Sequence, residues 1–242
     1  MNLAIDIGNT RGKVAVFEND TIIDMYVFEK KRIITTVKKI IKKYPNSEGI
    51  ISNVASISEI KLQKLKKNMK LQVVSYNTNV PFINLYKTPK TLGVDRIALV
   101  SAAICQFPDK NVLVIDAGTC ITFDFINENK EYLGGAISPG IKMRYKSLNN
   151  FTANLPLLEK EEVFDFVGKN TKESINSGVV NGVIKEINGI IEDYKEKFGV
   201  LTVVLTGGDT NFLSKQLKSS IFANQNFLLE GLNKILIFNK NK

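Results

Sequence analysis

The chain has 242 residues, 44% of them hydrophobic, which is enough apolar content for one large domain or two small ones. It contains no histidine, so histidine-based catalytic triads, histidine metal ligands and histidine general bases are excluded. The basic residues behind the net charge of +9 are nearly all lysine, and the lysine pairs at 38–39, 42–43 and 66–67 lie among Ile, Val and Leu without interleaved aromatic residues, which is typical of solvated helix faces. We therefore expect no nucleic-acid partner.

No apolar run approaches the length of a membrane span, and the first residues, MNLAIDIGN, include acidic and polar residues where a signal peptide has its apolar core. These features predict a cytoplasmic protein without a membrane partner. Cys105 and Cys120 both lie beside apolar residues and have no metal-ligand spacing, so we expect reduced, buried thiols.

The first eighty residues predict alternating strands and helices. Three strands are expected at residues 2–7, 12–18 and 21–28, joined by tight turns. Ile and Val then recur at helical spacing until Pro45-Asn46 ends the pattern. Further along we expect a strand at 49–54, a helix at 58–69 and a strand at 71–75.

The second half repeats this order. GVDRIALVSAAICQF predicts a helix that ends before Pro108, and an apolar strand at 111–119 then delivers Asp116 to a turn with Gly118 and Thr119. The remaining expected elements are strands at 120–126, 131–137 and 200–205, and helices at about 140–149 and 173–197. Both halves thus contain a strand with an Asp-x-Gly turn, two more strands, a helix, and a further strand and helix.

This internal duplication predicts an α/β protein of two lobes, each a mixed β-sheet with flanking helices. We place the first lobe at residues 1–90 and the second at residues 91–242. Ligands of α/β folds bind at strand ends, so we expect the active-site cleft between the lobes.

The stretch LAIDIGNTRGK places Asp6 at the end of an apolar strand, just before a turn that exposes backbone amides. Glycine lets the backbone approach a polyphosphate, and turn amides and a threonine hydroxyl can donate hydrogen bonds to phosphate oxygens. An aspartate at the strand end can hold a cation that neutralises the phosphates. Two such turns, at Asp6 and Asp116, predict phosphate binding, and Thr206-Gly207-Gly208-Asp209 is a third glycine-rich turn suited to a nucleoside or phosphate.

Six motifs together resemble the type III pantothenate kinases. The motifs are DIGNT with Lys13, YKTPKTLGVDR at 86–96, DAGT at 116–119, GGAISPG at 134–140, TKESI at 171–175 and LTGGD at 205–209. They occur in order over nearly the whole chain. That family belongs to the acetate kinase, sugar kinase, heat-shock ATPase and actin superfamily, so the resemblance implies an actin-like ATPase, ribonuclease H-like fold.

The resemblance also implies transfer of the ATP γ-phosphate to pantothenate, the first step of coenzyme A synthesis. Magnesium would accompany ATP, a potassium or ammonium ion would bind at Asp116, and the protein would be a homodimer. Asp95 would be the catalytic proton acceptor. By the same resemblance ATP is bound by Asp6, Ile7, Gly8, Asn9, Thr10, Arg11, Gly12, Lys13 and Thr119. Pantothenate is bound by Tyr86, Gly93, Val94, Asp95, Arg96 and Thr171.

Elementary chemistry agrees with these roles but leaves structural alternatives. Without histidine, a carboxylate must be the general base, and the planar guanidinium of Arg96 suits a carboxylate ligand. Asp95 and Arg96 could instead form a helix cap with a surface ion pair, and Thr171 could belong only to a capping cluster with Asn170 and Glu173. The TGGD turn could be an unliganded helix start, Tyr86 a half-buried loop residue, and Cys120 an inert core thiol.

Two other functions remain open at this stage. Members of this family have also been described as transcription-related accessory factors, and a kinase for another small hydroxylated substrate would share the same turns. Asp6, Asp95 and Asp116 together favour catalysis over accessory binding, and GVDR favours pantothenate. Val94, where the family often has alanine, and Cys120, where a small residue is usual, are minor departures from the family pattern.

Overall fold

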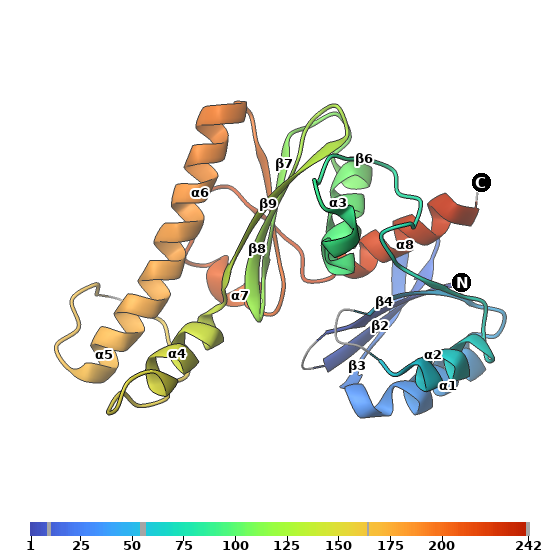
Figure 1. Cartoon of the computed structure of the whole chain (residues 1–242), viewed down its shortest axis with the longest axis horizontal. Coiled ribbons are helices and arrows are strands. Elements are labelled where there is room, and N and C mark those ends of the chain that lie inside the picture. Colours follow the sequence, from blue (N-terminus) through green and yellow to red (C-terminus); the bar gives the residue numbers. More distant parts are fainter. Residues whose placement is uncertain (9–10, 54–56, 164, 241–242) are drawn as a thin grey trace. The chain divides into compact units, whose positions relative to one another are not determined.

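The computed structural model describes residues 1–8, 11–53, 57–163 and 165–240 (Figure 1). It divides into two compact units, one formed by residues 1–109, 126–134 and 226–242 and the other by residues 110–125 and 135–225. The expected lobe boundary after residue 90 therefore falls inside the first unit. The reason is that α3 (Val94–Gln106) packs on the C-terminal helix α8 (Phe227–Lys240), which in turn packs on the first strand.

The first unit is built on a five-stranded sheet of order β3-β2-β1-β4-β5. Strand β2 is antiparallel to both β1 and β3, whereas β4 is parallel to β1 and β5. The strands are β1 (Asn2–Ile7), β2 (Arg11–Glu18), β3 (Thr21–Glu29), β4 (Glu48–Asn53) and β5 (Leu71–Val73). Helices α1 (Ile33–Lys43) and α2 (Glu59–Lys66) complete this part, close to the bounds expected from the sequence.

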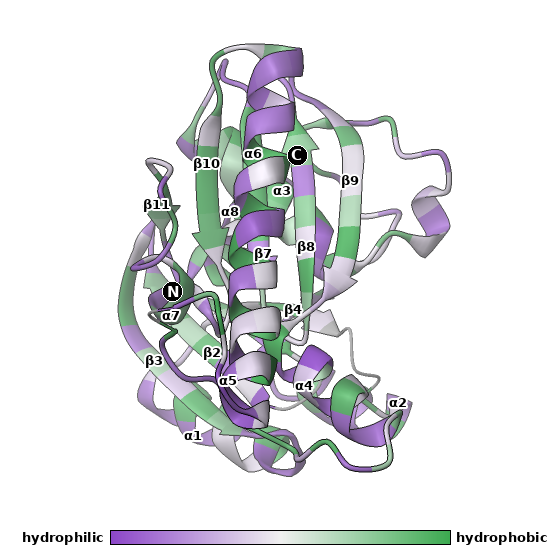
Figure 2. Cartoon of the chain, turned by 90° about the vertical axis from the view of Figure 1, so that its left-hand side faces the viewer, coloured by the Kyte–Doolittle hydropathy of each residue, from purple (hydrophilic) through white to green (hydrophobic). Residues whose placement is uncertain are grey.

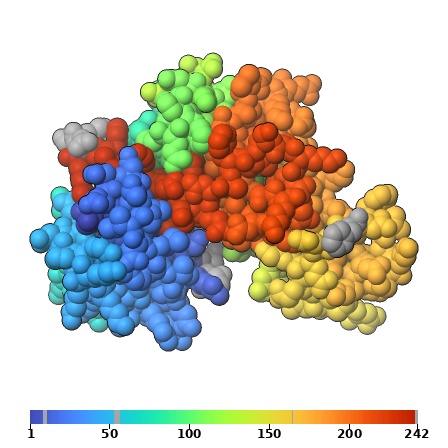
Figure 3. Space-filling model, turned by 180° about the vertical axis from the view of Figure 1, so that it is seen from behind, coloured from blue at the N-terminus to red at the C-terminus, as the bar shows by residue number. Residues whose placement is uncertain are grey.

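The alternation of side chains along β1 gives this sheet two different faces. Leu3, Ile5 and Ile7 belong to one apolar core with residues of α1 and α2. On the opposite face Asn2 donates a hydrogen bond from Nδ2 to Oδ1 of Asn233 on α8, at 2.8 Å. Figure 3 shows this C-terminal helix, in red, against the blue N-terminal strands. Asp6 follows Asn2 by four residues and therefore lies on the α8 face.

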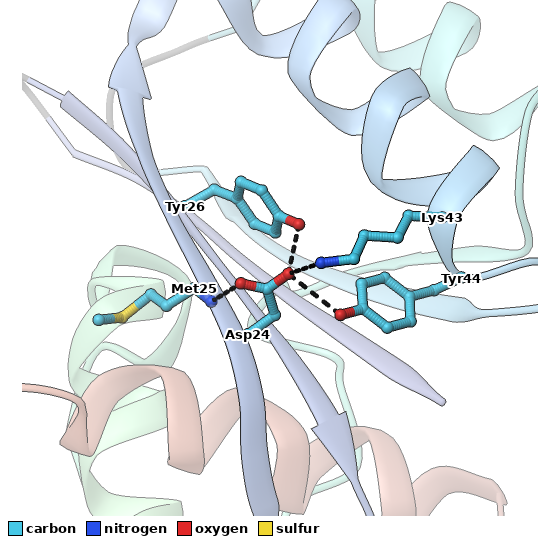
Figure 4. Close-up of polar contacts among 5 residues, drawn as sticks. All are labelled: Asp24, Met25, Tyr26, Lys43 and Tyr44. Atoms are coloured by element: carbon cyan, nitrogen blue, oxygen red, sulfur yellow. Dashed lines mark hydrogen bonds and ion pairs between the residues drawn. The ribbon is translucent and has the colours of Figure 1, made fainter.

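The edge strand β3 is fastened to the end of α1 through Asp24 (Figure 4). Oδ2 of Asp24 accepts hydrogen bonds from Lys43 Nζ at 2.8 Å, from Tyr44 Oη at 3.0 Å and from the hydroxyl of Tyr26. These donors, Lys43 first, hold the pKa of Asp24 well below its usual range. The cluster joins a strand to a helix and explains why an aspartate is tolerated on this apolar face.

The second sheet has the order β11-β10-β7-β8-β9-β6. Its strands are β6 (Ile83–Asn84), β7 (Val112–Ala117), β8 (Cys120–Ile126), β9 (Glu131–Pro139), β10 (Thr202–Thr206) and β11 (Phe222–Ala223). Strand β10 is parallel to β7 and β11, and β6 pairs with β9 at Glu131 and Tyr132, which are counted with the first unit. Leaving β6 aside, the first strand of each sheet lies at the centre, with the next two strands on one side and the last two on the other. The predicted duplication is therefore confirmed in the strand order.

The long helix expected at 173–197 is one helical run of three parts. These are α5 (Thr171–Asn176), a π-helical turn (Ser177–Asn181) and α6 (Gly182–Phe198). A π turn inserts one extra residue, and such turns are frequent at functional sites. Val183, Ile187 and Ile191 of α6 are fully buried in the core of this unit, and Figure 2 shows hydrophilic bands along α6 beside the mostly hydrophobic β10.

Two features depart from the sequence-based expectations. Helix α8 and the short elements β6, β11 and α7 (Thr210–Leu213) were not predicted. The prediction of a buried thiol is wrong for Cys105, which is exposed because the continuous buried stretch of α3 ends at Ile104. Helix α4 (Ile141–Asn150) begins where it was expected. Among the described residues, no helix is both long and apolar enough to cross a membrane.

Candidate active site

Asp6 lies at the end of β1 between two polar neighbours on adjacent strands. Strand register pairs it with Lys13 on β2 and with Ser52 on β4, so all three side chains share the α8 face. The pKa of Asp6 is raised to about 6, first by burial and then by the like charge of Asp95, while Lys13 and the Ser52 hydroxyl act in the opposite direction. The structure thus brings together Asp6 and Asp95, the two carboxylates to which the sequence assigned chemistry in this unit.

Gly8 and Gly12 shape the backbone on either side of the predicted phosphate turn after Asp6. The Gly8 amide donates to the Arg11 carbonyl at 3.2 Å, which closes the turn. Gly12 is buried, and a methyl group there would lie 2.6 Å from the Phe28 ring, so packing alone requires glycine at this position. Ile7 is buried in the apolar core and could offer a ligand only its backbone. The predicted contacts Asn9 and Thr10 lie outside the described residues.

Asp95 stands in the first turn of α3, after the helix cap Gly93. Its Oδ1 accepts a hydrogen bond from the Arg96 amide at 2.8 Å, and a methyl group at Gly93 would collide with this same oxygen. A carboxylate in the first turn also favours the positive end of the helix dipole. Asp95 therefore supports the helix start from inside the first turn, although Gly93 is the cap and Arg96 is buried rather than part of a surface ion pair. Asp95 also lies close enough to Asp6 to raise its pKa.

Two of the predicted pantothenate contacts also meet in the first unit. The Arg96 side chain is only 5% exposed, and its guanidinium carbon lies 5.5 Å from the centre of the Tyr86 ring. Tyr86 itself is half-buried. A guanidinium over an aromatic face is held electrostatically and keeps a fixed orientation. The structure thus presents Arg96 and Tyr86 as one group rather than as two independent residues.

In the second unit, three of the motifs converge through backbone hydrogen bonds. The turn after β7 is closed by the Gly118 amide, which donates to the Cys120 carbonyl at 2.9 Å. The Gly140 amide, at the end of GGAISPG, donates to the Thr119 carbonyl at 3.1 Å. The Asp209 amide, at the end of LTGGD, donates to the Ala117 carbonyl at 2.9 Å. The DAGT turn is therefore built into the other two motifs.

Gly207 shows how closely the LTGGD turn lies against the DAGT turn. It has a φ of +96°, and a methyl group there would collide with Oδ1 of Asp116 and the carbonyl of Ala117. Asp116 is half-buried, and an aspartate among turn carbonyls offers the oxygen ligands that hard cations such as potassium prefer. Within the part of the chain that the structure describes, no group of three or more His, Cys, Asp or Glu could form a metal centre.

Thr171 is the first residue of α5, in a capping cluster of the kind the structural alternative expected. Asn170 Oδ1 accepts from the Glu173 amide at 3.0 Å, and Glu173 Oε1 accepts from Asn170 Nδ2 at 2.8 Å. Thr171 also lines a cavity of about 670 Å³ together with residues of α4 and the π-helical turn, among them Arg144 and Gly178. The residues lining this cavity include none from the 116–119 turn.

Sequence reasoning missed two residues of the first unit. Ser52 is fully buried and faces Asp6 from β4, and its only signal was a polar residue inside the apolar strand GIISN. Tyr132 is fully buried and stacks on Tyr86, with ring centres 6.1 Å apart. It stands two residues before the GGAISPG motif, which the sequence could not connect to Tyr86 because the two lie far apart along the chain.

The chain is similar to known proteins in both sequence and fold. Residues 2–193 match the family model described as type III pantothenate kinase. The chain is 51% identical to the type III pantothenate kinase of Christiangramia forsetii, over 99% of both chains, and 48% identical to that of Flavobacterium johnsoniae, over 96% of both.

Two solved structures share the fold. A Baf family transcriptional activator from Campylobacter jejuni has a TM-score of 0.65 at 23% identity, covering 99% of this chain and 100% of that one. An N-acetylmannosamine kinase from Listeria monocytogenes has a TM-score of 0.56 at 12% identity, covering 99% of both. The chain therefore belongs to the type III pantothenate kinase family, on a fold that it shares with sugar kinases.

Proposed function

We propose that this protein transfers the γ-phosphate of ATP to the primary hydroxyl of pantothenate, the first step of coenzyme A synthesis. The observation that carries the proposal is the pair of interacting carboxylates Asp6 and Asp95, in a chain without histidine. Arg96 and Tyr86, which follow and precede Asp95 in one motif, form a single group next to the helix start. Family membership supplies the substrate.

The predicted site residues around Asp95 then each have a role in the reaction. Phosphoryl transfer depends on positioning and charge neutralisation, with a base for the attacking hydroxyl. Asp95 accepts the proton of that hydroxyl, and the guanidinium of Arg96 binds the pantothenate carboxylate beside the Tyr86 ring. Gly93 and Val94 also contact pantothenate, and Thr171 of the second unit completes the set.

The ATP contacts are the two turns that the sequence predicts to bind phosphate. Residues 6–13 hold the ATP phosphates with backbone amides and Lys13, and Asp6 faces the accompanying magnesium. In the second unit Thr119 contacts ATP, and Asp116 holds a potassium or ammonium ion. A bound cation of this kind neutralises phosphate charge. The way Gly207 fits against Asp116, without room for a side chain, supports a built site there.

We further propose that the protein acts in the cytoplasm as a homodimer, without nucleic-acid or membrane partners. The dimer is supported by the cavity beside Thr171, which is lined by apolar residues such as Leu148 and Val179 together with Ser147 and Ser174. Gly178, at this cavity, is exposed and has nothing within 4 Å of the position a side chain would take. Sedimentation at micromolar concentration should give twice the chain mass, and a fully active monomer would contradict this assembly.

The kinase itself is tested with purified protein, labelled pantothenate and MgATP, in potassium, ammonium and sodium buffers. We expect labelled 4'-phosphopantothenate, formed faster in potassium or ammonium than in sodium. Equal rates in all three buffers would remove the monovalent cation from the proposal but leave the kinase. ATP binding without any product would favour an accessory protein, and turnover of another hydroxylated compound alone would favour a different kinase.

A further inference from the structure

Four side chains of the first unit form a stack that ends at the proposed substrate contacts. The rings of Tyr86 and Tyr132 are nearly parallel, at 19° and 6.1 Å between centres, and Phe82 meets Tyr132 edge-on at 6.0 Å. The guanidinium of Arg96 lies over Tyr86 at 5.5 Å. Tyr132 is fully buried and Phe82 nearly so, whereas Tyr86 is half-buried. The stack therefore runs from the core to the site.

Backbone hydrogen bonds also hold the segment around Tyr86 against β9, the strand that carries Tyr132. The Leu85 amide donates to the Tyr132 carbonyl at 3.1 Å, and the Tyr86 amide donates to Asn84 Oδ1 at 3.0 Å. Two residues after Tyr132, Gly134 has a φ of +107°, and a methyl group there would lie 3.3 Å from Cδ2 of Tyr86. Gly134 thus leaves the space that the Tyr86 ring occupies.

We propose that Tyr132 and Gly134 are positioning residues for the substrate site, which fix the Tyr86 ring and, through it, the Arg96 guanidinium in the orientation that binds pantothenate. The inference rests on the proposed function. Neither residue needs to touch the substrate, since Tyr132 is fully buried. A long arginine side chain and a loop tyrosine would otherwise lose rotamer freedom on binding, and ordering them beforehand removes that cost.

The first test is steady-state kinetics of Tyr132→Leu with each substrate varied in turn. We expect the KM for pantothenate to rise about tenfold, while the KM for ATP changes by less than about twofold. Tyr132→Phe keeps the ring and should restore the wild-type KM. A raised KM in Tyr132→Phe would assign the effect to the hydroxyl and overturn the role of the ring.

The matched control for loss of a buried ring is Phe125→Leu. Phe125 stacks on Phe198 at 4.2 Å in the second unit and has no part in the proposed site. It should lower thermal stability without changing the KM for pantothenate. If Phe125→Leu raises that KM as much as Tyr132→Leu does, general loosening explains both variants and the inference fails.

The second test asks whether Tyr132 acts through Tyr86. In a double-mutant cycle, Tyr132→Leu should have almost no further effect on the KM for pantothenate once Tyr86 is alanine. Effects that multiply independently would overturn the inference. If Tyr132→Leu does not fold, Tyr132→Met carries the same cycle with an unbranched side chain that fills irregular space.

Gly134→Ala provides an independent variant, with Gly199→Ala as its control. Gly199 also has a positive φ, of +74°, but nothing lies within 4 Å of the position a methyl group would take. Only Gly134→Ala should raise the KM for pantothenate, because only there does the methyl group press on the Tyr86 ring. An unchanged KM in folded Gly134→Ala and Tyr132→Leu overturns this inference alone. A wild-type protein that never phosphorylates pantothenate overturns the proposed function, and the inference falls with it.

Discussion

The turns at Asp6 and Asp116 occupy equivalent places in two sheets of the same strand order, yet they are built differently. Asp6 lies among charged and polar side chains, namely Lys13, Ser52 and the carboxylate of Asp95. The turn after Asp116 is instead fixed by backbone amides from Gly140 and Asp209. Duplication preserved the topology while the surroundings of the two aspartates diverged.

This difference indicates that the two turns suit different tasks. A cluster of side chains with a shifted pKa suits proton transfer and charge neutralisation, because its groups can change protonation state. A turn locked by backbone hydrogen bonds keeps one shape and suits a rigid ligand cradle. Substitutions of Asp6 or Asp95 should therefore change chemistry and pH dependence, whereas those in the turn after Asp116 should change ligand affinity.

The largest effect is expected for Asp95→Asn. Asparagine keeps the shape and can still complement the helix start, but it cannot accept a proton. General-base contributions are about a hundred- to ten-thousand-fold, so turnover should fall on that scale. ATP affinity, measured by calorimetry, should stay within about threefold of the wild type, because the phosphate turns are unchanged.

Asp193→Asn, an exposed aspartate on α6, is the matched control and should be fully active. Near-normal turnover in folded, ATP-binding Asp95→Asn would leave Asp95 only its helix-start role. It would also remove the contrast between the Asp6 and Asp95 carboxylates, which supply the chemistry, and the rigid turn after Asp116, which binds a ligand.

The next effect tests the cradle. Gly207→Ala forces a methyl group onto Asp116 and Ala117 at a φ of +96°, so the second-unit turns must shift. We expect the KM for ATP to rise by roughly tenfold, with a smaller change in the KM for pantothenate. Gly208→Ala is the control, since nothing lies within 4 Å of its added methyl group. Equal effects of the two substitutions would show that the tight approach at Gly207 is unimportant.

Much of this architecture could be predicted from the sequence, because period-two strands and glycine turns give strong local signals. Strands β1, β2 and β3 were placed within about one residue of their observed bounds, and the duplication predicted the shared strand order. The resemblance supplied Asp95 and Arg96, which the structure joins to Asp6 and Tyr86.

The rest could not be predicted, because it depends on contacts between distant segments. Helix α8 was missed although Phe227, Leu229 and Leu232 are apolar at its start, and only packing on β1 makes it part of the first unit. The π-helical turn follows from local backbone geometry that periodicity does not resolve. Ser52 and Tyr132 gained meaning only when strand pairing placed them beside Asp6 and Tyr86.

A third effect concerns stability at the Asp6 cluster. The pKa of Asp6 in the folded protein, about 6, exceeds the unfolded value of about 3.9. Asp6 therefore favours folding most below pH 4 and loses that contribution as the pH rises through 6. At pH 7.5 the charged carboxylate then destabilises the fold by about 3 kcal/mol. Without ligands, Asp6→Asn should melt roughly 6–12 °C higher than the wild type at pH 7.5, and the two should converge near pH 4. A lower melting temperature of Asp6→Asn at pH 7.5 would show that the ionised Asp6 carboxylate stabilises the fold. Asp6 would then not differ from a structural carboxylate such as Asp24.

The smallest effect is expected at Asp24, on the opposite face of the same sheet, where the sign reverses. Hydrogen bonds from Lys43, Tyr26 and Tyr44 depress its pKa, so its contribution to folding is present above the unfolded pKa of about 4 and is lost as the pH falls further. Asp24→Asn should therefore melt lower than the wild type at pH 7, and the gap should close in acid. The change should be on the order of 1–2 °C, because solvent screens this exposed pair. Glu29→Gln, which replaces an exposed carboxylate at the end of the same strand, is the matched control for loss of a surface charge. Kinase activity should not change in either variant, because this cluster only fastens β3 to α1. If Asp24→Asn instead stabilised the protein at pH 7, as expected for Asp6→Asn, the two faces of the sheet would not differ in the way the pKa shifts indicate.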